Sequence, residues 1–181
     1  SQIHQAALTI LERTGVQVEE PQALAYFQKG GARIDGNRVR IPPHMVEKTL
    51  QTARNKVILA GRNPDNDLIL EGSRVHIGTG GAALQVLDLD TGQVRAAVLK
   101  DAADMALLVD ALPNIHFYLL PIYPTDIPVE SVEISKYFAA LCSTAKHVQA
   151  GVYTRQGLQD VITMAEYIMG GAEALRERPV V

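Results

Sequence analysis

Cysteine is scarce and long apolar runs are missing, and each absence excludes a class of protein. Cys142 is the only cysteine among 181 residues, so an internal disulfide and thiolate metal clusters are excluded. The apolar helical run around Cys142 predicts a small buried side chain, and we assign this thiol no chemical role. No apolar stretch approaches the roughly 20 residues of a membrane span, and no leader-like segment is found. We therefore expect a cytoplasmic protein with no membrane partner.

The chain also lacks an excess of charge of one sign. Its 17 basic and 20 acidic residues are mixed along the sequence and give a formal net charge of -3. No basic track could follow a phosphate backbone, so we expect no nucleic-acid partner. Hydrophobic residues make up 47% of the chain and charged residues 20%, which predicts a globular protein with a substantial core.

Motifs for metal binding and for acid–base catalysis are missing as well. The five histidines stand singly and without ligand spacing, so no metal site is expected: His4, His44, His76, His116 and His147. The sequence contains no G-x-S-x-G elbow, no Walker lysine and no pair of carboxylates in one loop. It carries no self-sufficient acid–base machinery.

Residues 1–72 predict a mixed α+β cap. Apolar residues at helical spacing predict a first helix that ends at Gly15, and Pro21 opens a second helix that Gly30-Gly31 closes. Asp35-Gly36 lies between two alternating runs and predicts a hairpin. The other elements expected here are a strand at residues 16–18, a helix after Pro42-Pro43, and strands at residues 56–60 and 68–70.

From residue 73 onward, apolar strands alternate with amphipathic helices, which is typical of a parallel α/β protein. The expected strands are residues 75–77, 115–122, 147–152 and the beginning of a fourth at 179–181. A hairpin around Asp90-Thr91-Gly92 precedes the first long helix, and Thr154 is expected to cap the last one, which Gly170-Gly171 ends.

This alternation fits either an open doubly wound sheet or an eight-stranded barrel. A barrel needs about 250 residues, and the visible strands are too few to close one. We therefore expect the chain to be the leading part of a longer protein, cut at its fourth strand.

The segment Gly78-Thr79-Gly80-Gly81-Ala82-Ala83 matches the dinucleotide-binding pattern G-x-G-x-x-A. That fingerprint requires a helix directly afterwards, whereas a hairpin is predicted here, so NAD and FAD are excluded. Two interpretations remain. The backbone of Thr79, Gly80 and Gly81 is either a turn that approaches a substrate or anion, or a structural loop whose glycines permit positive φ.

Tyr123, Asp126 and Tyr153 follow the C-terminal ends of two successive predicted strands. Parallel α/β proteins gather their ligand-contacting residues at these ends. Tyrosine faces and a carboxylate suit a cationic ligand such as a methylated ammonium, with about 0.5–2 kcal/mol from each cation–π contact. In the alternative interpretation the tyrosines only cover the barrel, and Asp126 caps the helix beginning near Val129.

Segments along the whole chain carry a family resemblance, and they occur in the family's order: Thr14-Gly15-Val16, Gly31-Ala32-Arg33-Ile34-Asp35-Gly36, Ala60-Gly61-Arg62-Asn63-Pro64, Val86-Leu87-Asp88-Leu89-Asp90-Thr91-Gly92, Asp110-Ala111-Leu112-Pro113-Asn114-Ile115 and Leu175-Arg176-Glu177-Arg178-Pro179. In these segments the chain resembles the trimethylamine methyltransferase family, which includes corrinoid-dependent methyltransferases for trimethylamine and for glycine betaine.

The resemblance implies an α/β fold, the N-terminal part of a TIM (β/α)8 barrel preceded by the mixed α+β cap. Residues 1–72 would be the cap and residues 73–181 the first strand–helix units. The implied reaction moves a methyl group from trimethylamine, glycine betaine or a related quaternary amine to the cobalt of a corrinoid. A partner protein carries that corrinoid, so the chain itself binds no cofactor. Members acting on trimethylamine are distinguished by a pyrrolysine later in the barrel, and we also expect a homo-oligomer.

No catalytic residue is assigned, and the expected substrate-binding residues are Tyr123, Asp126, Tyr153, Thr79, Gly80 and Gly81. Two other functions are considered. The chain could be a non-catalytic partial barrel that binds a small cation or a partner surface, or part of a phosphate-handling barrel enzyme that uses the glycine loop.

Overall fold

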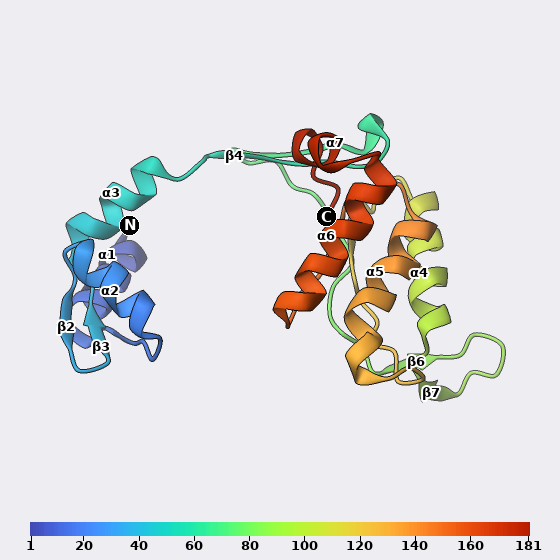
Figure 1. Cartoon of the computed structure of the whole chain (residues 1–181), viewed down its shortest axis with the longest axis horizontal. Helices are drawn as coiled ribbons and strands as arrows, with labels where there is room; N and C mark the ends of the chain where they lie inside the picture. Colours follow the sequence, from blue (N-terminus) through green and yellow to red (C-terminus); the bar gives the residue numbers. More distant parts are fainter. The chain divides into compact units, whose positions relative to one another are not determined.

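A computed structural model describes all residues, 1–181, and they form two compact units, Ser1–Arg54 and Asn55–Val181 (Figure 1). Seven α-helices and several small sheets make this a mixed α/β protein, as expected at the level of fold class. Each sheet has only two or three strands, and none closes into a barrel. The expected division between residues 72 and 73 stays a prediction.

The helices of the first unit begin and end at the predicted signals. Helix α1 (Gln2–Thr9) continues as one π-helical turn, η1 (Ile10–Thr14), and stops at Gly15, whose φ of 71° favours glycine. A Cβ there would also overlap the carbonyl group of Val39. Helix α2 (Pro21–Lys29) begins at its proline, and α3 (Pro43–Thr52) follows Pro42.

The sheet of the first unit has the order β1-β3-β2 and is antiparallel throughout. Strands β2 (Arg33–Asp35) and β3 (Arg38–Arg40) form the predicted hairpin around Gly36, and β1 (Val16–Gln17) pairs with β3. Val39 on the central strand is fully buried, so this small sheet contributes to the core of its own unit.

Two further hairpins lie in the second unit. The first joins β4 (Lys56–Leu59) to β5 (Leu68–Glu71) through a 3-10 turn, η2 (Pro64–Asn66). The second joins β6 (Gln85–Leu87) to β7 (Val94–Ala96), as the Asp90-Thr91-Gly92 motif predicted. The Asp88 carboxylate accepts hydrogen bonds from Thr91 and Arg95, and these bonds lower its pKa to about 2.

Four helices follow in the second unit: α4 (Leu99–Ala111), α5 (Val132–Ser143), α6 (Arg155–Met169) and α7 (Ala172–Glu177). Figure 1 shows α4, α5 and α6 side by side. Thr154 caps α6 as predicted, because its Oγ1 accepts the N–H of Gly157 at 2.9 Å, and Gly170 ends the helix at a φ of 88°. No helix combines the length and apolar character that crossing a membrane requires.

The segments before, between and after these helices lie side by side in sequence order, and the first three of them run parallel. Strand β8 (Tyr118–Leu119) pairs in parallel with β9 (Val148–Gln149). On its other side, parallel bridges join Gly78 to Phe117 and Ala83 to Ile122. The N–H of Val148 also donates to the carbonyl of Val180 at 3.1 Å. Each apolar segment therefore lies beside the one that precedes it in the chain.

The predicted strands in this array are longer than the observed ones, and one of them is wrong. Residues 75–77 form no strand, and Val75 is 80% exposed. Within residues 115–122 and 147–152, the strands β8 and β9 have only two residues each. An apolar run predicts burial, but a strand also needs a continuous backbone ladder beside it, and here that ladder is reduced to isolated bridges.

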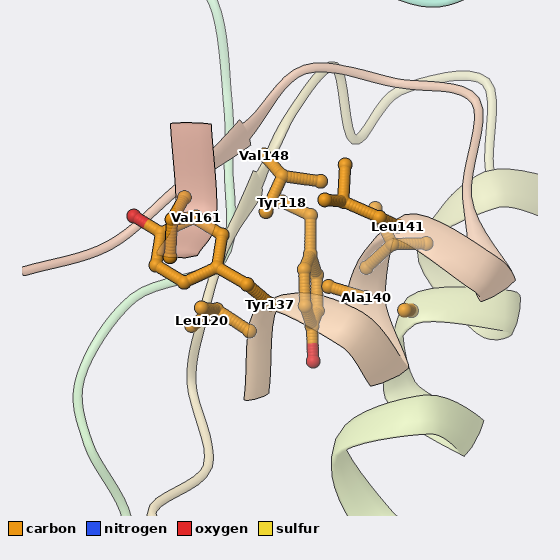
Figure 2. Packing of buried hydrophobic residues seen from close by; sticks show 9 residues of the cluster. Tyr118, Leu120, Tyr137, Ala140, Leu141, Val148 and Val161 are labelled. Atoms are coloured by element: carbon orange, nitrogen blue, oxygen red, sulfur yellow. The ribbon is translucent and has the colours of Figure 1, made fainter. Parts of the chain in front are cut away.

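The core of the second unit lies between the parallel segments and helices α4, α5 and α6. Figure 2 shows its centre, formed by Tyr118, Leu120, Tyr137, Ala140, Leu141, Val148 and Val161. The hydroxyl of Tyr118 donates to the carbonyl of Ala102 at 2.7 Å, and burial raises the pKa of this phenol. The donated bond satisfies the polar end of a ring that is otherwise surrounded by apolar atoms.

A buried lysine closes the C-terminal end of α4. The Nζ of Lys146 donates to the carbonyls of Val109, Leu112 and Ile115 at 2.6, 2.7 and 2.7 Å. Burial lowers its pKa, and the nearby carboxylate of Asp110 partly offsets this effect. The ammonium thus satisfies carbonyls that the helix leaves unpaired, where the helix dipole also favours a cation.

Cys142 corrects the sequence-based expectation, because it is exposed rather than buried. It lies four residues after Phe138 and eight after Ile134, on the face of α5 that points away from the core. The apolar run around it is explained by the opposite face, which buries Tyr137, Ala140 and Leu141.

Replacing Leu141 tests the location of the core. Leu141 is 1% exposed, so Leu141→Ala is expected to lower the free energy of unfolding by about 2–5 kcal/mol. Leu107→Ala, at a leucine on α4 that is 56% exposed, is expected to change it by less than about 0.5 kcal/mol. Urea unfolding followed by tyrosine fluorescence measures both variants, and equal effects would contradict this core.

Candidate functional site

A cavity of about 700 Å³ opens where the chain leaves β8 and β9. Its wall comes from the loop after β8, from η3 (Val129–Ser131), from the start of α5 and from the start of α6. The lining residues are Tyr123, Val129, Glu130, Val132, Glu133, Tyr153, Thr154 and Gln156. Two of the expected site residues, Tyr123 and Tyr153, thus meet in one cavity.

A lysine that the sequence did not single out stands over both tyrosine rings. The Nζ of Lys136 lies 5.4 Å from the ring centroid of Tyr123 and 5.6 Å from that of Tyr153. Both distances are within the range of cation–π attraction. Lys136 is 4% exposed, and burial lowers its pKa while the charge of Glu133 raises it. The ring pair that we expected to receive a cationic ligand therefore already holds a cation of the protein.

Glu133 is a buried carboxylate that joins α5 to the beginning of α6. It accepts the backbone N–H of Tyr153, the N–H of Thr154 at 3.1 Å and the hydroxyl of Thr154 at 2.9 Å. The bond from Tyr153 is the main reason why the pKa of Glu133 is lowered; burial opposes it, and Thr154 adds to it. A Cβ at Gly157 would overlap this carboxylate, so the absence of a side chain there lets α6 approach.

Asp126 is not part of this cavity. Its Oδ1 accepts the backbone N–H of Leu99 at 2.9 Å, at the first turn of α4. The hydroxyl of the preceding Thr125 donates to the carbonyl of Ala97 at 3.0 Å. The expectation that Asp126 caps the helix near Val129 is therefore wrong, since its partner is a helix that lies earlier in the chain. A carboxylate is favourable at the N-terminus of either helix, α4 or the one that begins near Val129.

No residue of the glycine loop, residues 78–81, lines this cavity. Gly78 passes beneath the ring of Phe117, where a Cβ would overlap the ring atoms. The hydroxyl of Thr79 donates to the carbonyl of Leu119 at 2.8 Å, and Gly81 has a φ of 94°. The close approach of the Phe117 ring explains why residue 78 is a glycine, and the positive φ explains why residue 81 is one. A substrate or anion at Thr79, Gly80 and Gly81 stays a prediction.

The sequence held a signal for the two charged residues that we overlooked. Glu133, Lys136, Tyr137 and Ala140 follow the spacing i, i+3, i+4, i+7, which places them on one face of a helix. All four residues are buried, so the helix face that holds Tyr137 and Ala140 also holds the two charged side chains. No group of three or more His, Cys, Asp or Glu side chains is arranged to hold a metal ion.

The Glu133 contacts predict a pH-dependent loss of stability. Because folding lowers the pKa of this carboxyl, its stabilisation is present above the ordinary glutamate pKa and is lost as the pH falls through the folded value. Glu133→Gln is expected to be less stable than the parent at neutral pH, and the difference is expected to shrink as the pH falls below the glutamate range. Tyrosine-monitored urea unfolding at a series of pH values measures this difference.

Glu130→Gln is the matched control, because Glu130 is an exposed carboxylate of the same cavity. It is expected to unfold like the parent at every pH. A Glu133→Gln deficit that does not change with pH would contradict the role given to the charge.

Comparison with known proteins places the whole chain in one family. A family model described as "Trimethylamine methyltransferase (MTTB)" matches residues 1–181. Trimethylamine methyltransferase MttB of Desulfitobacterium hafniense (strain DSM 10664 / DCB-2) is 36% identical over 180 residues, which cover 98% of this chain and 36% of that protein. Glycine betaine methyltransferase of Desulfitobacterium hafniense (strain Y51) is 27% identical over 179 residues, covering 98% and 37%.

A relative from another genus gives the same result. Trimethylamine methyltransferase MttB1 of Methanosarcina acetivorans is 29% identical over 187 aligned positions, covering 98% of this chain and 37% of that protein. The chain thus spans a little over a third of the length of these curated relatives. With a match that extends over all its residues, the chain belongs to the trimethylamine methyltransferase family.

Proposed function

We propose that the protein containing this chain transfers a methyl group from a methylated amine to the cobalt of a corrinoid carried by a separate partner protein. The observation that carries this proposal is the family match over residues 1–181. The relatives act, by their names, on trimethylamine and on glycine betaine, so the proposed substrate class is tertiary and quaternary methylated amines.

The arrangement of the second unit supports a TIM (β/α)8 barrel for the whole protein. Its parallel segments lie side by side in sequence order, and α4, α5 and α6 form neighbouring pairs. Successive strand–helix units that advance in one direction, with adjacent helices in contact, are what a barrel requires. Within this proposal residues 73–181 supply the first units, and residues 1–72 form a cap before them.

The position and size of the cavity also support the proposal. It lies past the C-terminal ends of β8 and β9, where barrel enzymes hold their substrates. A volume of about 700 Å³ is in the usual range for small-molecule sites, so a methylated amine fits it. A corrinoid is a far larger molecule, which agrees with its assignment to a partner protein.

The residues of this chain would bind and orient the amine. Tyr153, whose side chain is 70% exposed, and Glu130 both present groups to the cavity that attract a methylated ammonium. When bound to its partner protein, the corrinoid supplies the nucleophile that accepts the methyl group. A quaternary substrate leaves as a neutral amine and needs no proton, so orientation and charge are sufficient contributions from the enzyme.

Demethylation of an amine tests the function directly. The full-length protein, its corrinoid partner and a reductant are incubated with trimethylamine, glycine betaine or tetramethylammonium, and mass spectrometry measures the demethylated product. We expect product from at least one of these amines, and none when the corrinoid partner is omitted. Absence of product with all three amines would contradict the proposal.

Two tyrosine variants of the full-length protein test whether the cavity is the substrate site. Tyr153→Ala is expected to lower kcat/KM by about 2- to 30-fold, the fold-change of losing one cation–π contact. Tyr167→Ala is the matched control, since Tyr167 is a 91% exposed tyrosine on α6 outside the cavity lining, and it is expected to react like the parent. Equal kcat/KM values for the two variants would show that Tyr153 does not contribute to substrate binding.

A further inference from the structure

The sheet of the first unit carries two like charges side by side on its polar face. Arg33 on β2 and Arg40 on β3 lie directly opposite each other in the antiparallel register. Side chains alternate along a strand, so both arginines lie on one face, while Ile34 and the fully buried Val39 lie on the other. Like charges directly opposite each other destabilise a sheet, so an anion that bridges them is favoured here.

Contacts within the unit hold Arg40 and leave Arg33 free. The Nε of Arg40 donates to the carbonyl of Arg13 at 3.2 Å, and its Nη1 lies 3.5 Å from a carboxylate oxygen of Asp35. Arg33 is exposed and takes part in none of the ion pairs of the chain. One guanidinium is therefore positioned by the fold, and the other has its donors available.

The two arginines line a cavity of about 280 Å³. Its other lining residues come from η1, from the turn after α2 and from the beginning of α3: Glu12, Gly31, Pro42 and His44. The imidazole of His44 adds a further nitrogen to the two guanidinium groups. Nitrogen groups on three side chains can meet oxygens that point in several directions, as those of a tetrahedral anion do.

A carboxylate in the same cavity restricts which anion can bind. Glu12 is exposed and forms no ion pair with the arginines or the histidine that line the cavity with it. An anion without a proton would face the charge of Glu12 and be repelled. A phosphate group retains an acidic hydroxyl around its second pKa of about 6, and this hydroxyl can donate to a carboxylate.

We propose that this cavity binds a phosphate group, either free phosphate or a phosphate monoester. The guanidinium groups of Arg33 and Arg40 donate to its charged oxygens, because a guanidinium matches the spacing of phosphate oxygens. The carboxylate of Glu12 accepts the remaining P–OH and so selects phosphate over sulfate. The site belongs to the first unit alone and does not depend on the proposed methyl transfer.

Inorganic phosphate, glycerol phosphate and sulfate are suitable probes. The full chain is titrated with each at about pH 6.5 and at constant ionic strength in chloride, and NMR follows the Nε–Hε signals of the arginines. We expect phosphate to shift the signals of Arg33 and Arg40 saturably and sulfate to bind more weakly. Tighter binding of glycerol phosphate than of phosphate would indicate an ester as the ligand, and the reverse would indicate free phosphate. No saturable phosphate binding, or equal binding of sulfate, would overturn the inference.

Replacing Arg33 tests the paired guanidinium groups without disturbing other contacts. Arg33→Gln is expected to weaken phosphate binding by about 10- to 100-fold, as for loss of a charge-assisted hydrogen bond. Arg54→Gln is the matched control, since Arg54 is an exposed arginine of the same unit outside the cavity lining, and it should bind phosphate like the parent. Equal phosphate affinity in Arg33→Gln would overturn the inference.

Replacing Glu12 tests the selection of phosphate. Glu12→Gln is expected to bind sulfate more tightly than the parent does and to lose the preference for phosphate, because the repelling charge is gone. Glu19→Gln, at an exposed glutamate of the same unit outside the cavity lining, should keep that preference. An unchanged preference in Glu12→Gln would overturn the assignment of the ligand as phosphate.

Discussion

The carboxylate of Glu133 is the constraint on which the geometry of the cavity depends. It accepts two backbone amides and one hydroxyl at the point where the chain leaves β9 and enters α6. A negative charge at a helix N-terminus is stabilised by the unpaired amides and by the helix dipole. Because Glu133 belongs to α5, the same contacts fix α6 against α5 and place the ring of Tyr153 beside Lys136. The position of one wall of the cavity thus follows from a single buried carboxylate.

Features set by a few neighbouring residues could be predicted from the sequence. Gly15 and Gly170 end helices because their backbone has a positive φ, and Thr154 begins one because its hydroxyl accepts an amide of the first turn. The hairpin turns at Gly36 and Gly92 could be predicted for the same reason, because these glycines also have a positive φ. The sequence also predicted that Tyr123 and Tyr153 lie close together. Each follows a parallel strand, and the C-terminal ends of parallel strands meet at one edge of the sheet.

Features that depend on distant partners could not be predicted in this way. The extent of strand pairing at residues 115–122 depends on the backbone of residues 78–83, which the glycines keep irregular. Asp126 accepts an amide 27 positions earlier in the chain, so its local sequence indicated the wrong helix. Charges on a helix usually face solvent. Only the spacing of Glu133 and Lys136 with Tyr137 and Ala140 shows that they do not.

The protonation of Glu133 tests this account most directly. Carbon-13 NMR of the glutamate side-chain carboxyl signals, recorded as the folded chain is titrated with acid, measures the pKa of this one group. A pKa clearly below the usual glutamate range is expected, because the charged form accepts the amides of Tyr153 and Thr154. A pKa at or above the usual range would contradict the account, since the carboxylate would then not be the charged acceptor that joins α5 to α6.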